Sequence, residues 1–177
     1  MTVSRILIAG IGNIFMGDDA FGSEVARRLL CRAWPEGVRV VDFGIRGFDV
    51  AYALMDGCET AILVDAVPRG GQPGTVYVIE PDLHELDDPL FQNAPLQTHA
   101  MHPLEILRLV RSLGGTFPRL LLVGCEPADL GPEDEGKLGL SDVVAAAVGR
   151  ASDVIESLVT DLLDAKPIQP SNRVSTR

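Results

Sequence analysis

Residues 5–22 read Arg5-Ile-Leu-Ile-Ala-Gly-Ile-Gly-Asn-Ile-Phe-Met-Gly-Asp-Asp-Ala-Phe-Gly22. The apolar run from Arg5 to Ala9 is ended by two glycines, which predicts a buried strand followed by a turn. Apolar residues then recur at helical spacing from position 19 to about position 33, and Asp18 or Asp19 is a candidate N-cap for that helix. A strand, a turn and a helix at the start of the chain favour an α/β fold.

The rest of the chain continues this alternation. Strands are predicted at 38–42, 61–65, 75–79 and 119–124, and helices at 48–55, 102–113 and 140–163. The link at 68–74 is too short for a helical crossover, so the strand after it should run antiparallel to the strand before it. We therefore expect an α/β fold with a mostly parallel five-stranded sheet and helices on both faces. Residues 1–165 are expected to form one domain, and 166–177 a flexible C-terminal tail.

Charge and cysteine content narrow the possible partners and compartment. With 15 Lys and Arg against 25 Asp and Glu, the 177-residue chain carries a formal charge of −10, which disfavours nucleic acid and anionic membrane surfaces. The longest near-apolar run, residues 6–17, is too short for a membrane span and lacks the features of a signal peptide. Three widely spaced cysteines fit a reducing compartment, so a cytoplasmic protein is expected.

Acidic residues follow several of the predicted strands. Asp19 comes after the first strand, Asp65 ends the third, and His99 lies in the long loop before the next helix. In parallel α/β sheets the carboxyl ends of the strands form the usual ligand-binding edge. Two carboxylates and an imidazole can bind a divalent transition metal and leave a coordination position open. The alternative is structural, with Asp19 as an N-cap, Asp65 as an acceptor for turn amides and His99 as an exposed loop residue.

A dinucleotide-binding site is disfavoured. Gly10 and Gly12 begin a G-x-G-x-x-G pattern, but position 15 is phenylalanine rather than glycine. Asp18 and Asp19 occupy the place where a pyrophosphate would meet the helix N-terminus, and their charges would repel it. No nucleotide is therefore expected as a ligand.

Several blocks of sequence together resemble one protein family. The blocks are 6–22 quoted above, Asp42-Phe-Gly-Ile-Arg-Gly47, Ile62-Leu-Val-Asp-Ala66, His99-Ala-Met-His-Pro-Leu-Glu-Ile-Leu107, Val123-Gly-Cys-Glu-Pro127 and Gly139-Leu-Ser. In this order they strongly resemble the hydrogenase maturation proteases, the endopeptidases that process the large subunit of nickel–iron hydrogenases. The resemblance covers roughly residues 5–160. It implies a three-layer sandwich around a central twisted sheet.

The resemblance also implies a substrate and a site. The substrate would be the hydrogenase large-subunit precursor, cut near its C-terminus once nickel is inserted. Asp19, Asp65 and His99 match the family positions implicated in contacting that nickel, and these are the expected catalytic residues. The metal would arrive with the precursor, and no organic cofactor is expected. The first position is often glutamate in the family, so the shorter Asp19 places its oxygen about 1.5 Å further back.

A second group of residues is tied by the resemblance to substrate recognition. It consists of Asp42, Gly44, Arg46 and Gly47, and Glu126 is a further carboxylate expected to line the same cleft. The alternative for the two glycines is that they only permit a tight turn between strand and helix.

Other readings of the chemistry remain open at this point. His102, three residues after His99, could assist it if the helix begins earlier than predicted. Cys125 could act as a nucleophile with His99, although a buried structural thiol is favoured. The chain contains neither an H-E-x-x-H nor a G-x-S-x-G motif. A non-catalytic, nickel-binding assembly factor using the same three residues is the alternative function.

Overall fold

The computed structural model describes residues 5–82, 103–116, 118–131 and 135–165. Its sheet contains β1 (Ile6–Ile11), β2 (Val38–Gly44), β3 (Thr60–Ala66), β4 (Val76–Ile79) and β5 (Arg119–Cys125) in the order β2-β1-β3-β5-β4. The first four strands in this order are parallel, whereas β4 pairs with β5 in the antiparallel direction. The predicted mostly parallel sheet and its one antiparallel strand are both confirmed.

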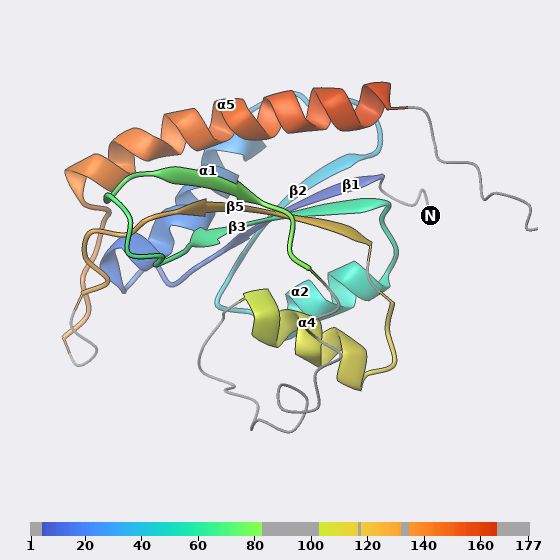
Figure 1. Ribbon diagram of the computed structural model, residues 1–177, viewed down its shortest axis with the longest axis horizontal. Helices are drawn as coiled ribbons and strands as arrows, with labels where there is room; N and C mark the ends of the chain where they lie inside the picture. The colour runs from blue at the N-terminus through green and yellow to red at the C-terminus, as the bar shows by residue number, and fades with distance from the viewer. Residues whose placement is uncertain (1–4, 83–102, 117, 132–134, 166–177) are drawn as a thin grey trace, which may run out of the picture.

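Helices cover both faces of the sheet, which confirms the three-layer sandwich (Figure 1). Helices α1 (Phe21–Leu30) and α5 (Asp142–Asp164) pack together on one face. Helices α2 (Gly47–Met55) and α4 (Pro103–Ser112) pack together on the other. No helix in the described part of the chain is both long and apolar enough to span a membrane.

Strand β1 shows why the sequence produces two cores. Successive side chains of a strand point to opposite faces, so Ile6 and Ile8 pack under α1 and α5, while Leu7 and Ala9 pack under α2 and α4. All four are almost completely buried. A strand buried on both faces reads as a continuous apolar run, which is the pattern that predicted it.

Helix α1 lies unusually close to the sheet because of Gly22. A Cβ atom at this position would collide with the carbonyl oxygens of Ile11 and Val64, at the ends of β1 and β3. Only glycine permits this approach. The segment that leads into α1 is thereby held over the carboxyl ends of the two central strands.

The start of α1 corrects one expectation from the sequence. A short 3-10 helix, η1 (Gly17–Ala20), precedes α1, and the N-cap of α1 is Ala20, with no side-chain capping hydrogen bond. The prediction that Asp18 or Asp19 caps this helix is therefore wrong. Both aspartates belong to η1, and their carboxylates accept hydrogen bonds from residues outside α1.

Candidate active site

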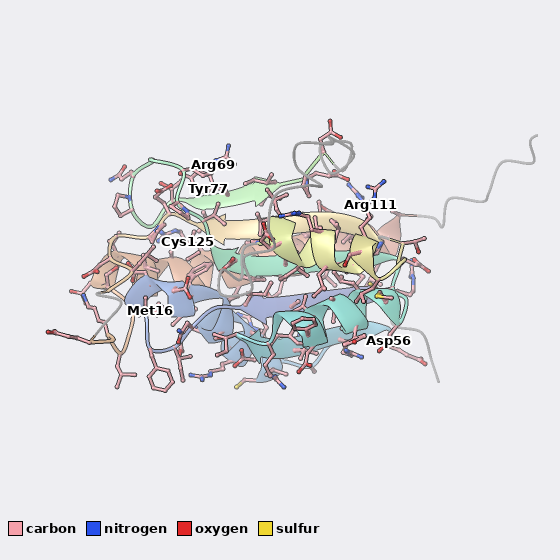
Figure 2. All side chains as sticks on the ribbon, turned by 90° about the horizontal axis from the view of Figure 1, so that it is seen from below. Met16, Asp56, Arg69, Tyr77, Arg111 and Cys125 are labelled. Atoms are coloured by element: carbon pink, nitrogen blue, oxygen red, sulfur yellow. The ribbon has the colours of Figure 1, made fainter. Side chains whose placement is uncertain are left out.

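The carboxyl ends of the parallel strands meet at one edge of the sheet. Figure 2 shows Met16 and Cys125 at this end of the molecule, and Asp56, which precedes β3, at the opposite end. The predicted site residues that the structure describes all lie in β2 or β3 or in segments that follow a strand. His99 and His102 lie outside the described residues, so the histidine part of the predicted site stays a prediction.

Asp19 and Asp65 are brought together at this edge. Asp65 is the penultimate residue of β3 and is 6% exposed, and Asp19 lies in η1 and is partly buried. The Asn13 backbone N–H donates to Asp19 Oδ2 at 2.8 Å, and the Ala66 N–H donates to Asp65 Oδ1 at 2.8 Å. Each carboxylate therefore has one backbone donor that fixes its orientation. The structural alternative for Asp65, that it accepts a hydrogen bond from a nearby backbone amide, is therefore supported by the Ala66 contact.

Burial disfavours the charged form of both carboxylates. Burial raises the pKa of Asp19, and the Asn13 N–H partly opposes that shift. The pKa of Asp65 lies well above its ordinary value, first because of burial and then because of the charge on Asp19. Neither carboxylate forms an ion pair with a Lys or Arg of the described segments. A cation placed between them would favour both charged forms.

Two oxygen ligands do not by themselves make a resident metal site. Within the described ranges, no group of three or more His, Cys, Asp or Glu side chains is arranged to hold an ion. The carboxylates of Asp19 and Asp65 could supply oxygen ligands to a metal whose other ligands come from elsewhere.

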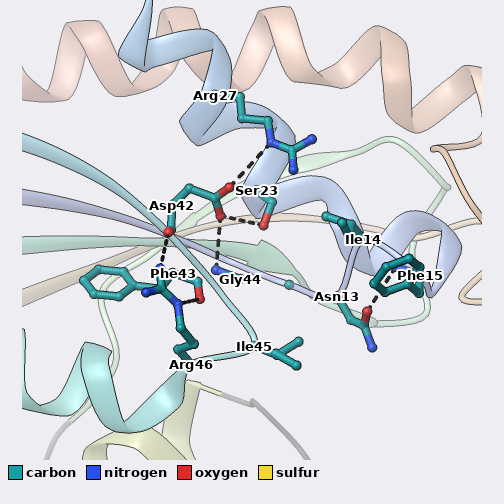
Figure 3. Close-up of a pocket in the computed structure, with 11 residues that line it drawn as sticks. Asn13, Ile14, Phe15, Ser23, Arg27, Asp42, Phe43, Gly44, Ile45 and Arg46 are labelled. Atoms are coloured by element: carbon teal, nitrogen blue, oxygen red, sulfur yellow. Dashed lines mark hydrogen bonds and ion pairs between the residues drawn. The ribbon is translucent and has the colours of Figure 1, made fainter.

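A pocket lies beside this pair, between the segment after β1 and the end of β2 (Figure 3). Its volume is about 290 Å³. Asp42 forms one wall, where Oδ1 accepts hydrogen bonds from the Ser23 hydroxyl at 2.8 Å and the Gly44 N–H at 3.1 Å. Arg27 Nε lies 3.5 Å from Asp42 Oδ2. Asn13 also lines the pocket, and its N–H donates to Asp19. The loop after β1 therefore contacts both the pocket and the carboxylate pair.

Arg46 is folded back onto its own loop. Its Nε donates to the Phe43 carbonyl at 3.0 Å and its Nη2 to the Asp42 carbonyl at 2.9 Å. Gly44 has φ +56, which favours glycine, and Gly47 begins α2. The turn-forming explanation of the glycines thus has structural support at Gly44, while the role of this loop in recognition stays a prediction.

The rim of the pocket is apolar, which the sequence analysis missed. Phe15 is 59% exposed and Ile45 is 60% exposed, and Figure 3 shows them flanking the pocket with Ile14. Large apolar side chains in glycine-containing loops, outside any periodic segment, were the available signal. Exposed apolar side chains grouped at a concave surface are typical of binding sites.

The carboxylate of Glu126 is hydrogen-bonded to the loop between β3 and β4. Its carboxylate accepts the N–H groups of Arg69 and Gly70 and the Tyr77 hydroxyl, at 2.9–3.1 Å. Loss of solvent would raise the pKa of Glu126, but these hydrogen bonds outweigh it and lower the pKa. Figure 2 shows Arg69 beside Tyr77, and the guanidinium lies 5.5 Å from the ring centre. Glu126 thus organises this loop, and its contact with substrate stays a prediction.

Cys125 has the properties of a structural thiol. It is fully buried at the end of β5, and burial is the main cause that raises its pKa to about 11. The thiolate is the nucleophilic form of cysteine, and this environment opposes it. The structure therefore favours the buried structural thiol over the nucleophile.

Comparisons with known proteins point to one family. The family model described as hydrogenase maturation protease matches residues 23–158. A putative hydrogenase maturation protease of Methanocaldococcus jannaschii is 32% identical over 156 residues, covering 88% of this chain and 96% of that protein. The hydrogenase expression/formation protein HupM of Azotobacter chroococcum is 37% identical, covering 75% of this chain and 61% of that protein.

Solved structures give the same result. The hydrogenase maturating endopeptidase HybD of Escherichia coli superposes with a TM-score of 0.70 at 26% identity, covering 89% of this chain and 93% of that one. The family match spans well over half of the sequence, and the fold agrees with that of a solved member. The chain therefore belongs to the hydrogenase maturation protease family.

Proposed function

We propose that this protein is an endopeptidase that removes a C-terminal extension from the nickel-loaded large-subunit precursor of a nickel–iron hydrogenase. The observation that carries the proposal is the pair Asp19 and Asp65, two neighbouring carboxylates whose pKa values are both raised at the ligand-binding edge of the sheet. Family membership supports the hydrolase activity. The nickel dependence and the substrate are part of the proposal.

The carboxylate pair suits a metal that comes with the substrate. In the described segments the chain offers two oxygen ligands, and His99 is the third ligand implied by the resemblance. The precursor would supply the remaining ligands of the nickel, and the nickel would supply the Lewis acidity for hydrolysis. A precursor without nickel leaves two repelling carboxylates facing each other, so its productive complex is less stable.

The residues of the chain then serve peptide hydrolysis. Asp19 and Asp65 orient the nickel-bearing segment, and a carboxylate accepts the proton of the attacking water. The water oxygen bonds to the scissile carbonyl carbon, the C–N bond breaks, and the proton leaves with the new amine of the released peptide. Hydrogen bonds from Asn13 and Ala66 hold the two carboxylates in place during these steps.

The neighbouring pocket suits an adjacent part of the precursor. Asp42, Gly44, Arg46 and Gly47 belong to its walls or to the turn beneath it, and Phe15 and Ile45 give it an apolar rim. The loop that contains Asn13 connects the pocket to Asp19. Precursor chain bound across this loop would therefore present its backbone to the carboxylate pair.

The test is to incubate purified precursor, with and without bound nickel, with the protein and to measure intact mass. The proposal predicts shortening at the C-terminus of the nickel-loaded precursor only. Equal shortening of both forms would contradict the substrate-metal proposal. Tight binding of the loaded precursor without shortening would replace it with the alternative of a non-catalytic, nickel-binding assembly factor.

A further inference from the structure

Asp18 is a buried carboxylate for which the proposed chemistry has no use. It is 0% exposed and lies directly before Asp19 in η1. Its oxygens accept four hydrogen bonds: from the N–H groups of Ala128 and Asp129 at 2.8 Å each, and from the N–H and hydroxyl of Ser141 at 2.7 and 2.9 Å. A buried carboxylate is costly unless it is hydrogen-bonded in this way.

All four donors come from distant sequence. Ala128 and Asp129 follow β5, and Ser141 is the N-cap residue of α5. Ser141 also ends the block Gly139-Leu-Ser, which resembles the family but has no role in the proposed site. Asp18 is therefore the point where η1, the segment after β5 and the start of α5 are joined.

Backbone contacts join the same segments. The Asp18 N–H donates to the Asp129 carbonyl at 2.9 Å, and the Gly17 N–H donates to the Lys137 carbonyl at 2.8 Å. A four-residue 3-10 helix has little intrinsic stability, and η1 lacks a side-chain cap. The position of η1 is consequently set by its direct continuation into α1 and by the hydrogen bonds to Ala128, Asp129, Lys137 and Ser141.

The position of η1 determines where Asp19 lies relative to Asp65. Asp65 belongs to the central strand β3 and is fixed in the sheet, where it pairs with Gly124 of β5. Asp19 lies outside the sheet on η1, and within the described segments its side chain accepts one hydrogen bond, from the Asn13 N–H. A shift of about 1 Å at a catalytic group can cost about 100-fold in rate.

We propose that Asp18, held by Ser141, is a positioning residue that sets Asp19 against Asp65. The inference rests on the proposed function, because it assigns a purpose to the placement of Asp19. Asp18 touches neither substrate nor metal, and it acts only through the backbone of η1. The segment after β5 at Ala128 and Asp129, and the start of α5 at Ser141, are thereby required for the activity.

Kinetics of precursor processing give the first test. Asp18→Asn replaces one acceptor oxygen by a donor that opposes the Ser141 N–H, and kcat is expected to fall by about 100-fold with KM within about twofold. Ser141→Ala, which keeps the backbone donor, should show a smaller fall, and Ser141→Thr, which restores the hydroxyl, should recover it. The Ser141 pair also keeps the proposal testable if Asp18→Asn does not fold.

The matched control is a core variant far from η1. Val159 is buried in α5, and Val159→Ala lowers the melting temperature without touching Asp18. It should retain wild-type kcat when assayed below its melting temperature. An equal loss of kcat in Val159→Ala at equal loss of stability would overturn the positioning role, as would wild-type kcat in a folded Asp18→Asn.

A second readout does not depend on processing. The Asn13 amide proton reports the hydrogen bond to Asp19, and its NMR chemical shift should move in Asp18→Asn and Ser141→Ala but not in Val159→Ala. An unchanged Asn13 shift in Asp18→Asn would contradict the inference even if no precursor is cleaved. Absence of processing by the wild-type protein, with the shift change present, would instead count against the proposed function alone.

Discussion

Asp19 and Asp65 come from different parts of the fold, yet the charge of Asp19 raises the pKa of Asp65. Asp65 is the penultimate residue of a central strand, whereas Asp19 lies on a short helix that is hydrogen-bonded to distant segments of the chain. The pair therefore depends on tertiary structure at both residues. Ionising Asp65 beside Asp19 therefore lowers the free energy of unfolding of the protein.

Asp65→Asn is expected to stabilise the protein while abolishing its activity. The folded-state pKa of Asp65 lies above its ordinary value of 3.8, so the folded chain binds this proton more tightly than the unfolded chain. Its stabilising contribution is present below about pH 3.8 and is lost as pH rises through the folded-state pKa. The asparagine removes this loss and can still accept the Ala66 N–H.

Urea unfolding across pH measures this difference. The free energy of unfolding of Asp65→Asn should exceed that of wild type at pH 7, and the gap should close toward pH 3.5, while processing falls by about 100-fold or more. Asp153→Asn, at an exposed position of α5, should show neither effect. A gap independent of pH would mean that the carboxylate is not destabilised as described.

Cys125→Ala is expected to retain processing within about threefold. The thiol is buried with a pKa near 11, so it is not available as a thiolate at neutral pH. The loss of its packing should lower the free energy of unfolding by about 1 kcal/mol. A processing assay combined with a denaturation curve separates the two effects, and complete loss of processing by a folded variant would restore Cys125 as a candidate nucleophile.

Ile45→Asp is expected to weaken precursor binding. Ile45 is exposed at the rim of the pocket beside Asp42, and removing a large apolar contact costs about 1–3 kcal/mol of binding, or roughly 5- to 150-fold in KM. Leu30→Asp, which changes an equally exposed apolar residue at the far end of α1, is the matched control. Equal KM values for the two variants would remove the pocket from the recognition surface.

Two glycines should respond oppositely to alanine. Gly22→Ala places a Cβ against the carbonyl oxygens of Ile11 and Val64, and overpacking of this kind costs about 1–3 kcal/mol. Gly149 lies within α5 with open space around it, so Gly149→Ala should add about 0.5–1 kcal/mol. Thermal unfolding of both variants checks the prediction, and a stable Gly22→Ala would contradict the close packing of α1.

Most of the fold could be predicted because short-range sequence patterns determine its strands and helices. Apolar runs such as residues 5–9 mark strands buried on both faces, and the short link at 68–74 identified the antiparallel strand. The boundary of α1 was the exception. The two aspartates look like helix caps in sequence, but long-range donors draw Asp18 into η1, and α1 begins only at Phe21.

The candidate site was predictable only in part. Placing Asp19 and Asp65 at one edge follows from the rule that parallel strands end together. The role of Asp18 could not be deduced, because its partner Ser141 is 123 positions away and no local pattern links them. The hydrogen bond from the Arg69 N–H to Glu126 could not be predicted either, because these two residues are also far apart in sequence. His99 remains assigned by resemblance alone.

The most direct test of the account is the intact mass of nickel-loaded precursor after incubation with wild type, Asp19→Ala, Asp65→Ala or His99→Ala. The exposed control is Asp153→Ala. The account predicts a shortened precursor with wild type and the control, and a full-length precursor with the other three variants, each confirmed to be folded. Full processing by Asp19→Ala and Asp65→Ala would contradict it.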